Sequence, residues 1–266
     1  MDHREKLEWA SRQLDSFDEE FDNFVALHPF ATRTDIQHEA RRIRLLACPS
    51  APMPSHWPFL IGDIIHNTRC ALDYLTWELS LRAPVPPNPS EMRDIQFPIC
   101  TSHGEYWGSG PNGKGGKRVR RLRFLDPRAQ AIIDGLQPHL RGEAAEDHPL
   151  AVLNELANED KHRKVLLTIL IADVNHVSFL HFGGPILPTT RVSTPTRRYE
   201  TDAELKVFDF HQAIPEKDVE VTGHPTGNVA FDGTGAASGL GVLGFLRGAH
   251  DRIRIQVFEP LEPFLA

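Results

Sequence analysis

Apolar residues in the first third of the chain recur at the spacing of long helices. Between residues 7 and 24 they follow each other at steps of three and four, which predicts a helix packed along one continuous seam. The seam consists of Leu7, Ala10, Leu14, Phe17, Phe21 and Phe24. A second run, from about Pro58 to Leu81, has a broader apolar face and a proline suited to the first turn of a helix. Both segments are expected to lie in a helical bundle.

Shorter patterns predict two further helices and leave one segment open. Asp126 and Pro127 provide an N-cap and a first-turn proline for a helix that ends before Pro138. Regularly spaced leucines predict another helix from about residue 147 to His162. The segment 41–47 alternates as an edge strand does, but a helix continuing from residue 34 fits nearly as well.

From residue 164 the pattern becomes strand-like. The segments KVLLTILIA, NHVSFLHF, ELKVFDF, VEVTG and NVAF are separated by turn residues, and they predict an antiparallel sheet of four to six strands. A last helix, from about Gly239 to Phe258, carries a long apolar seam. Because that seam needs a partner, we expect the last helix to pack on the first or the second one.

This order of elements predicts an α+β protein, in which a helical bundle carries an antiparallel sheet from the C-terminal half. A chain of 266 residues is expected to form a single elaborated domain, residues 1–266. Residues 1–163 would be mainly helical and residues 164–235 mainly strands. Residues 236–266 would form the C-terminal helix that returns to the bundle.

Composition limits the partners and the cellular location that we expect for the protein. The formal net charge of −7 gives no overall attraction to nucleic acid or to an anionic membrane. Three scattered cysteines do not suggest a disulfide framework. The N-terminal residues contain no apolar signal core, and the longest apolar run is too short to span a bilayer. We therefore expect a soluble, cytoplasmic protein without a membrane partner, and a homo-oligomer remains open.

The strongest polar motif, HNTRCALDYLTW, lies within the second helix. Helical projection gathers four of its side chains within one arc of roughly 80°, opposite the apolar face. These four are His66, Arg69, Asp73 and Trp77. Apolar groups also occur on this side, so the helix is expected to be sandwiched and its charged groups to need partners. The arc is either a functional site or a buried structural network, and the pattern leaves both open.

A second polar motif, Asn158-Glu159-Asp160-Lys161-His162-Arg163, ends the helix near residue 162. Asp160 projects onto the apolar side, where a carboxylate needs a cation or several hydrogen-bond donors. Arg69 or His66 could supply them, which would join the two motifs into one site. Alternatively, the motif is an ordinary polar helix C-terminus whose basic residues complement the helix dipole.

Other signals are weaker. The glycine-rich basic stretch between Lys114 and Arg123 could contact nucleic acid. The preceding GSGPNGK begins like a phosphate loop, but Gly115 stands where Ser or Thr is required. His250, on the seam of the last helix, is of a kind that is more often a core residue than a ligand. No helix carries the usual metal-ligand spacing, so no metal is expected, and the cofactor is unknown.

Three motifs in this order resemble a family of uncharacterised bacterial proteins: HNxRxALDxLxW (His66 to Trp77), QFPI (Gln96 to Ile99) and NxDKHR (Asn158 to Arg163). The resemblance covers roughly the first two thirds of the chain, and Thr68 stands where a leucine is expected. It implies a shared fold and a shared polar centre, and no particular activity. A looser similarity to HEPN-like helical bundles would imply RNA or nucleotide substrates.

The leading hypothesis is an enzyme or ligand-binding protein that acts on a small anionic or phosphate-bearing molecule. His66 or His162 would be the general acid or base, and Asp73 or Asp160 would orient it. The side chains expected to bind the ligand are Asn67, Arg69, Trp77, Asn158, Lys161 and Arg163. One alternative is a non-catalytic interaction protein with a buried structural polar network. Another is a HEPN-like nucleic-acid binder that uses the basic stretch.

Overall fold

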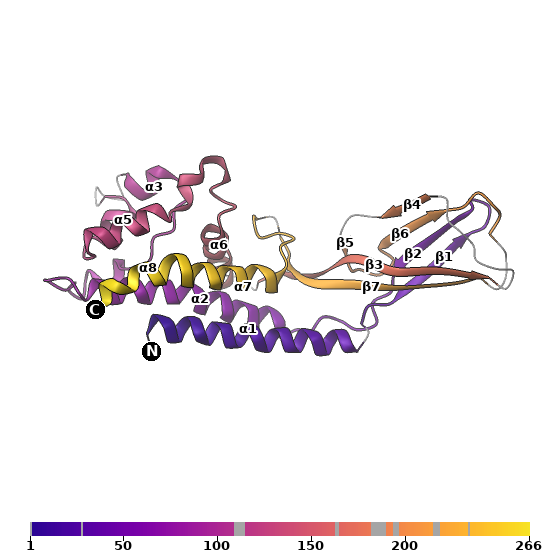
Figure 1. Ribbon diagram of the computed structural model, residues 1–266, viewed down its shortest axis with the longest axis horizontal. Coiled ribbons are helices and arrows are strands. Elements are labelled where there is room, and N and C mark those ends of the chain that lie inside the picture. The colour runs from indigo at the N-terminus through magenta and orange to yellow at the C-terminus, as the bar shows by residue number, and fades with distance from the viewer. Residues whose placement is uncertain are drawn as a thin grey trace. The chain divides into compact units, whose positions relative to one another are not determined.

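The computed structural model describes residues 2–27, 29–108, 115–162, 165–181, 190–193, 197–214, 219–233 and 235–266 (Figure 1). The chain forms two compact units. The helical unit comprises Met1–Phe17, His56–Val165 and Gly233–Ala266, and the sheet unit comprises Asp18–Ser55 and Leu166–Asp232. The fold class is α+β, as predicted. A single elaborated domain stays a prediction.

The helical unit contains the expected long helices. Its elements are α1 (His3–Ala26, whose second half belongs to the sheet unit), α2 (Trp57–Ser80), η1 (Met92–Asp94), α3 (His103–Trp107), α4 (Lys117–Leu122), α5 (Pro127–Gly135), η3 (Pro138–Ala144), α6 (Pro149–His162) and α7 (Val242–Arg252). After α7 the chain continues as a π-helical turn, Ile253–Phe258, and then as α8 (Glu259–Leu261) and η5 (Glu262–Leu265).

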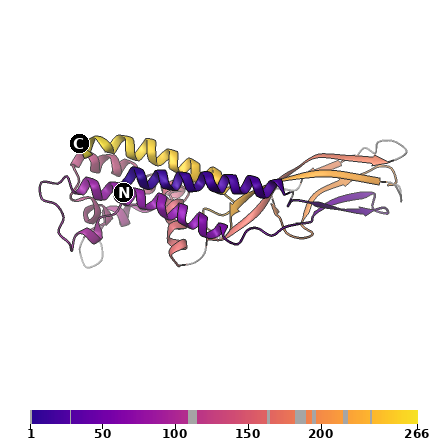
Figure 2. The same ribbon diagram turned by 90° about the horizontal axis from the view of Figure 1, so that it is seen from below.

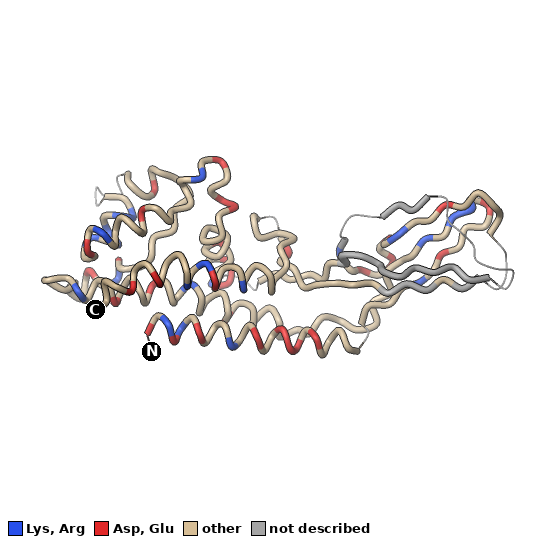
Figure 3. The backbone as a smooth tube through the Cα atoms, in the orientation of Figure 1, with Lys and Arg blue, Asp and Glu red and all other residues tan. Residues whose placement is uncertain are grey.

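Local sequence signals explain where several helices begin. Asp126 caps α5 by accepting a hydrogen bond from the backbone N–H of Arg128 at 2.8 Å, as its pattern predicts. Pro58 lies in the first turn of α2. Acidic residues predominate along the second half of α1 and form its solvated side (Figure 3).

The C-terminal helix packs against the first two long helices, as expected from its apolar seam. His250 of α7 lies 2.6 Å from the Thr68 hydroxyl of α2, and Arg247 forms an ion pair of 3.3 Å with Asp15 of α1. Figures 1 and 2 both show α7 and α8 running beside α1 and α2. The buried seams include Leu14 of α1, which is 2% exposed.

The sheet unit contains two antiparallel sheets within the described residues. Their strands are β1 (Thr32–Gln37), β2 (Arg42–Ala47), β3 (Leu167–His181), β4 (Thr190–Ser193), β5 (Arg197–Arg198), β6 (Glu204–Asp209) and β7 (Val219–Phe231). One sheet has the order β1-β2-β6-β4 and the other has the order β5-β3-β7. The first sheet covers a core that includes Ile43, Leu45 and Phe208.

Two expectations about the sheet need correction. Residues 42–47 form an interior strand, not an edge strand, because β2 pairs with β1 on one side and with β6 on the other. Two strands of the sheet unit therefore come from the N-terminal half of the chain. The segments expected to form separate short strands also join: β3 and β7 are long strands paired from Leu167↔Phe231 to His181↔Val219.

None of the helices in the described part of the chain has the length and apolar character needed to cross a membrane.

Candidate functional site

Arg69 of α2 is buried, and each of its three guanidinium nitrogens donates to an acceptor inside the helical unit. Its Nη1 donates to Asp73 Oδ1 at 2.6 Å, and its Nη2 donates to the backbone carbonyl of Phe97 at 2.8 Å. A longer bond of 3.4 Å runs from Nε to Asn154 Oδ1 of α6. Each nitrogen of the guanidinium is thus engaged by a group of the protein itself.

The same helix turn holds the backbone of the QFPI segment. The N–H of Phe97 donates to Asp73 Oδ1 at 2.8 Å, while its carbonyl also accepts from Arg121 Nη1 at 3.3 Å. The Phe97 side chain is completely buried. Burial, and then the positive charge of Arg69, lower the pKa of Arg121. Arg69 and Asp73 form a structural clip that fixes the segment before α3, which is the arrangement expected of the non-catalytic alternative.

The other residues of the α2 motif point to different surroundings. Asn67 donates to Gln13 Oε1 of α1 at 2.7 Å. His66 is exposed, and its Nε2 lies 3.4 Å from the Sγ atom of Cys70, one helical turn further along α2. Trp77 is half-buried. The predicted arc therefore does not enclose one common cavity.

Asp160 of α6 lies against α2, so the prediction that these helices are neighbours is confirmed. A Cβ atom built on Gly62 would collide with the Asp160 carboxylate, which packs directly over that glycine. Burial raises the pKa of Asp160, whereas His66 lowers it and Asp63 raises it further. Arg69 bonds elsewhere, and no ion pair joins Asp160 to the described side chains of α2.

The end of the second motif is only partly described. His162 is the last residue of α6, but its side chain lies outside the described residues, as does Arg163. Lys161 is exposed. Asn158 is exposed too, and it faces a cleft that the sequence did not predict.

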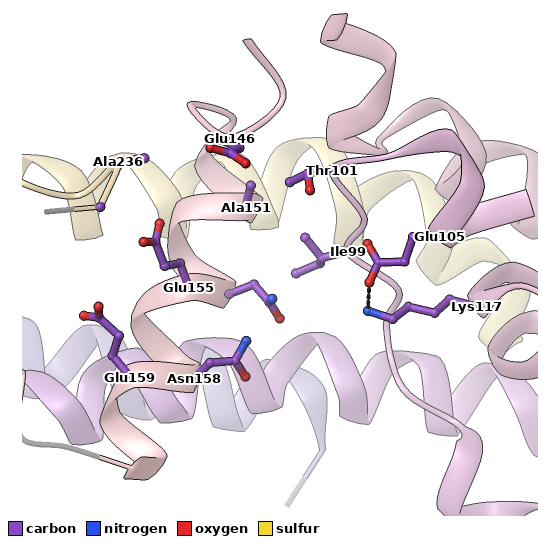
Figure 4. Close-up of a pocket in the computed structure, with 12 residues that line it drawn as sticks. Ile99, Thr101, Glu105, Lys117, Glu146, Ala151, Glu155, Asn158, Glu159 and Ala236 are labelled. Atoms are coloured by element: carbon purple, nitrogen blue, oxygen red, sulfur yellow. Dashed lines mark ion pairs between the residues drawn. The ribbon is translucent and has the colours of Figure 1, made fainter. Parts of the chain in front are cut away.

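This cleft has a volume of about 720 Å³ and follows one side of α6 (Figure 4). Its walls come from α6 and Glu146 shortly before it, from residues 99–105 with Lys117, and from residues 235–236, which precede α7. The lining residues are Ile99, Thr101, Glu105, Lys117, Glu146, Ala151, Asn154, Glu155, Asn158, Glu159, Gly235 and Ala236. In Figure 4, Lys117 extends from the wall opposite Asn158.

Acceptor groups dominate the described lining of the cleft. The described lining has four carboxylates and one lysine, and that lysine already forms an ion pair with Glu105. Asn154 and Asn158 add two amides from the same face of α6. The Glu155 carboxylate packs over Gly235, where a Cβ atom would collide with it. The cleft has an excess of negative charge and is therefore suited to a cation.

The carboxylates do not converge on one point. Across the parts of the chain that the structure describes, no group of three or more His, Cys, Asp or Glu side chains is placed to hold a metal ion. The negative charges are instead spread along the cleft from Glu105 to Glu159.

Most cations of the predicted basic stretch are engaged inside the helical unit. Arg118 donates to both Asp134 oxygens, at 2.7 and 2.9 Å, and Arg123 forms an ion pair of 3.1 Å with Glu91. Lys117 pairs with Glu105, and Arg121 bonds to the Phe97 carbonyl. Residues 117–122 form α4, whereas Lys114 lies outside the described residues.

The two motifs predicted ten site residues. Among the described residues that line the cleft, only Asn158 is one of these ten. The missed residues of α6 had a signal in the sequence. Ala151, Asn154, Glu155, Asn158 and Glu159 follow each other at steps of three, one, three and one, which places them on one helix face. Glu105 and Glu146 had no such signal, because the tertiary fold alone brings them beside α6.

No protein-family model, no curated protein and no solved structure matches this chain.

Proposed function

We propose that the chain is a binding protein for a small organic cation with several charged amino groups, of the polyamine class, held in the cleft beside α6. The observation that carries this proposal is the charge of the described lining: Glu105, Glu146, Glu155 and Glu159 against Lys117, which already pairs with Glu105. Carboxylates and amide oxygens accept hydrogen bonds from ammonium groups.

The arrangement of these groups favours a linear cation over a single ion. A metal ion needs several ligands at one point, and the acidic side chains of the cleft are distributed instead. A polyamine carries its charges at intervals along a flexible chain, so each ammonium group can meet a different carboxylate. A volume of about 720 Å³ is in the range of small-molecule sites.

The ligand proposed for this cleft is a cation, whereas the two polar motifs led us to expect an anion. Arg69, one of the three basic residues expected to hold an anion, is buried and bonded to Asp73 and Phe97. An anion in the cleft would meet an excess of carboxylates among the described lining residues, and like charges at close range repel. The geometry therefore supports binding of a cation at this place.

Neutralising one wall of the cleft tests the proposal. We expect Glu155→Gln and Glu146→Gln each to weaken the binding of spermidine about fivefold, because each removes one partly exposed ion pair of about 1 kcal/mol. Glu19→Gln, at an exposed position of α1 outside the cleft, is the control and should leave the affinity unchanged. Equal affinities in all three variants and the parent would contradict the proposal.

An acid–base role on an anionic molecule is a second candidate, at a different place. The observation in its favour is that Asp160 has a raised pKa and has His66, an exposed side chain, as its charge neighbour on α2. His66 would exchange the proton, and Asp160 would orient it. If so, His66→Asn should abolish turnover of a phosphate ester and leave the melting temperature nearly unchanged, while unaltered turnover would remove this candidate.

A further inference from the structure

A second cleft lies between α1 and the C-terminal helix, within the helical unit and apart from the cleft beside α6. It has a volume of about 350 Å³. Leu7 and Phe258, both largely buried, give it apolar surface, and Glu8 and Ser11 of α1 also line it. Figures 1 and 2 show the two helices that enclose it side by side.

His250 lines this cleft with one edge of its ring and reaches the core with the other. Its Nε2 lies 2.6 Å from Thr68 Oγ1, and the Thr68 hydroxyl donates its only proton to the carbonyl of Ile64 at 2.7 Å. Nε2 must then carry the proton that Thr68 accepts, which leaves Nδ1 as a bare acceptor. The side chain is only 8% exposed, and burial keeps it neutral by lowering its pKa to about 4.

Nδ1 has no hydrogen-bond partner among the described residues. It is also not one of the described polar atoms that are sealed from solvent without a partner. The acceptor is therefore reached from the cleft that His250 lines. An acceptor held in a fixed orientation by Thr68 is an arrangement suited to a ligand that donates a hydrogen bond.

The charged residues around this cleft favour the same kind of ligand. Arg4 pairs with Glu262, and Arg254 lies 3.4 Å from Asp251 and 3.7 Å from Glu259, so both guanidiniums are neutralised by the protein. Glu8 forms no direct ion pair with any side chain that the structure describes, and its charge acts on Arg4 only as a minor cause of that residue's raised pKa. What remains is an acceptor nitrogen, a carboxylate and apolar surface.

The backbone is unusual at the same place. Directly after α7, residues Ile253–Phe258 adopt a π-helical turn, and two of its side chains, Arg254 and Phe258, line the cleft. Such turns are rare and occur frequently at functional sites. This observation is independent of the hydrogen bonding of His250.

We propose that the cleft between α1 and the C-terminal helix is a second binding site, which takes a small organic amine with an apolar body. The ammonium group donates to Nδ1 of His250 and is neutralised by Glu8, while the apolar body covers Leu7 and Phe258. The site differs in chemistry from the cleft beside α6, whose described lining is dominated by carboxylates and amides.

Nitrogen NMR of the imidazole rings, with 2-phenylethylamine as the probe, tests this site. The His250 resonances, assigned by their loss in His250→Gln, should show a protonated Nε2 and a bare Nδ1, and Nδ1 should shift when the amine is added. Ser11→Phe fills the cleft and should weaken that binding about tenfold or more, while spermidine binding beside α6 stays unchanged.

Two results would overturn the proposal: no Nδ1 shift at amine concentrations up to about 10 mM, or an undiminished shift in Ser11→Phe. Should Ser11→Phe not fold, Glu8→Gln replaces it, because Glu8 is exposed and its substitution leaves the packing intact. Loss of the Glu8 charge should weaken the amine about threefold. An unchanged affinity there would equally overturn the site.

Discussion

The backbone N–H and the backbone carbonyl of Phe97 are both bound by charged side chains from one turn of α2. Its N–H bonds to Asp73 and its carbonyl bonds to Arg69, so neither group of the buried segment lacks a partner. The pair Arg69–Asp73 is itself i,i+4 on the helix. Because Arg69 binds both Asp73 and the Phe97 carbonyl, we expect it to stabilise the fold.

We expect Arg69→Ala to lower the free energy of unfolding by about 2–3 kcal/mol, because it removes the charged partner of the half-buried Asp73 and the shorter of the two hydrogen bonds to the Phe97 carbonyl. Chemical denaturation measures the loss. The control is Arg128→Ala, since Arg128 and its partner Asp126 form an exposed ion pair. If Arg69→Ala were as stable as this control, the clip would contribute nothing to the fold.

His250 should make the stability depend on pH. Its pKa in the folded protein is about 4, below the ordinary value of 6.5, so the unfolded chain takes up a proton more readily. The stability is complete above pH 6.5 and falls by about 3 kcal/mol as the pH drops to 4. His148, also lowered to about 4, adds to the same fall.

The variant His250→Gln removes the contribution of His250 to this fall and leaves that of His148. Urea denaturation between pH 4 and pH 7.5 should show a shallower pH dependence for the variant than for the parent. Parallel curves would show that His250 titrates normally in the folded protein.

The position of a single side chain could be predicted from the sequence where it depends on helical geometry alone. The position of Asp160 against α2 followed from its projection onto the apolar face of α6. The partner of Arg69 did not follow, because it is a backbone carbonyl 28 residues away, and a carbonyl has no sequence signal. The same limit hid the hydrogen bond between Thr68 and His250, which are 182 residues apart.

At the scale of elements, the contact between α2 and α6 depends on the absence of a side chain at Gly62. The Asp160 carboxylate occupies the place where a Cβ atom would stand. We expect Gly62→Ala to destabilise the protein by about 1–3 kcal/mol, although alanine is the better helix former. Gly248→Ala in α7 is the matched control: nothing lies within 4 Å of its added Cβ, so it should stabilise by about 0.5–1 kcal/mol.

Combining Gly62→Ala with Asp160→Ala separates this collision from other causes. The double variant should regain most of the stability lost by Gly62→Ala, because the shortened side chain leaves room for the methyl group. Thermal melts of both single variants and the double variant give the coupling energy. Additive losses would mean that Gly62 and Asp160 do not meet.

Helices were easier to predict than strand pairing for a physical reason. The 3.6-residue period of α1 and α2 is written in neighbouring positions, and both helices were found within a few residues of their ends. Pairing of β2 with β6 joins positions such as Ile43 and Phe208, whose relation depends on the whole fold. The π-helical turn after α7 also has no apolar period of its own to reveal it.

At the scale of the whole molecule, both proposed binding sites belong to the helical unit. A change in the core of the sheet unit should therefore alter stability and not binding. We expect Ile43→Val, at a fully buried position, to lower the free energy of unfolding by about 1 kcal/mol. Calorimetric titration of the folded variant with spermidine should give the affinity of the parent, and a changed affinity would show that the sheet unit contributes to the cleft.

The measurement that tests the central claim most directly is a calorimetric titration of the unaltered protein with spermidine, and separately with inorganic phosphate, at two salt concentrations. The described lining of the cleft beside α6 has four carboxylates and one paired lysine. We predict that spermidine binds, that its affinity falls as salt rises, and that phosphate does not compete with it. Binding of phosphate in place of spermidine would contradict this account of the cleft.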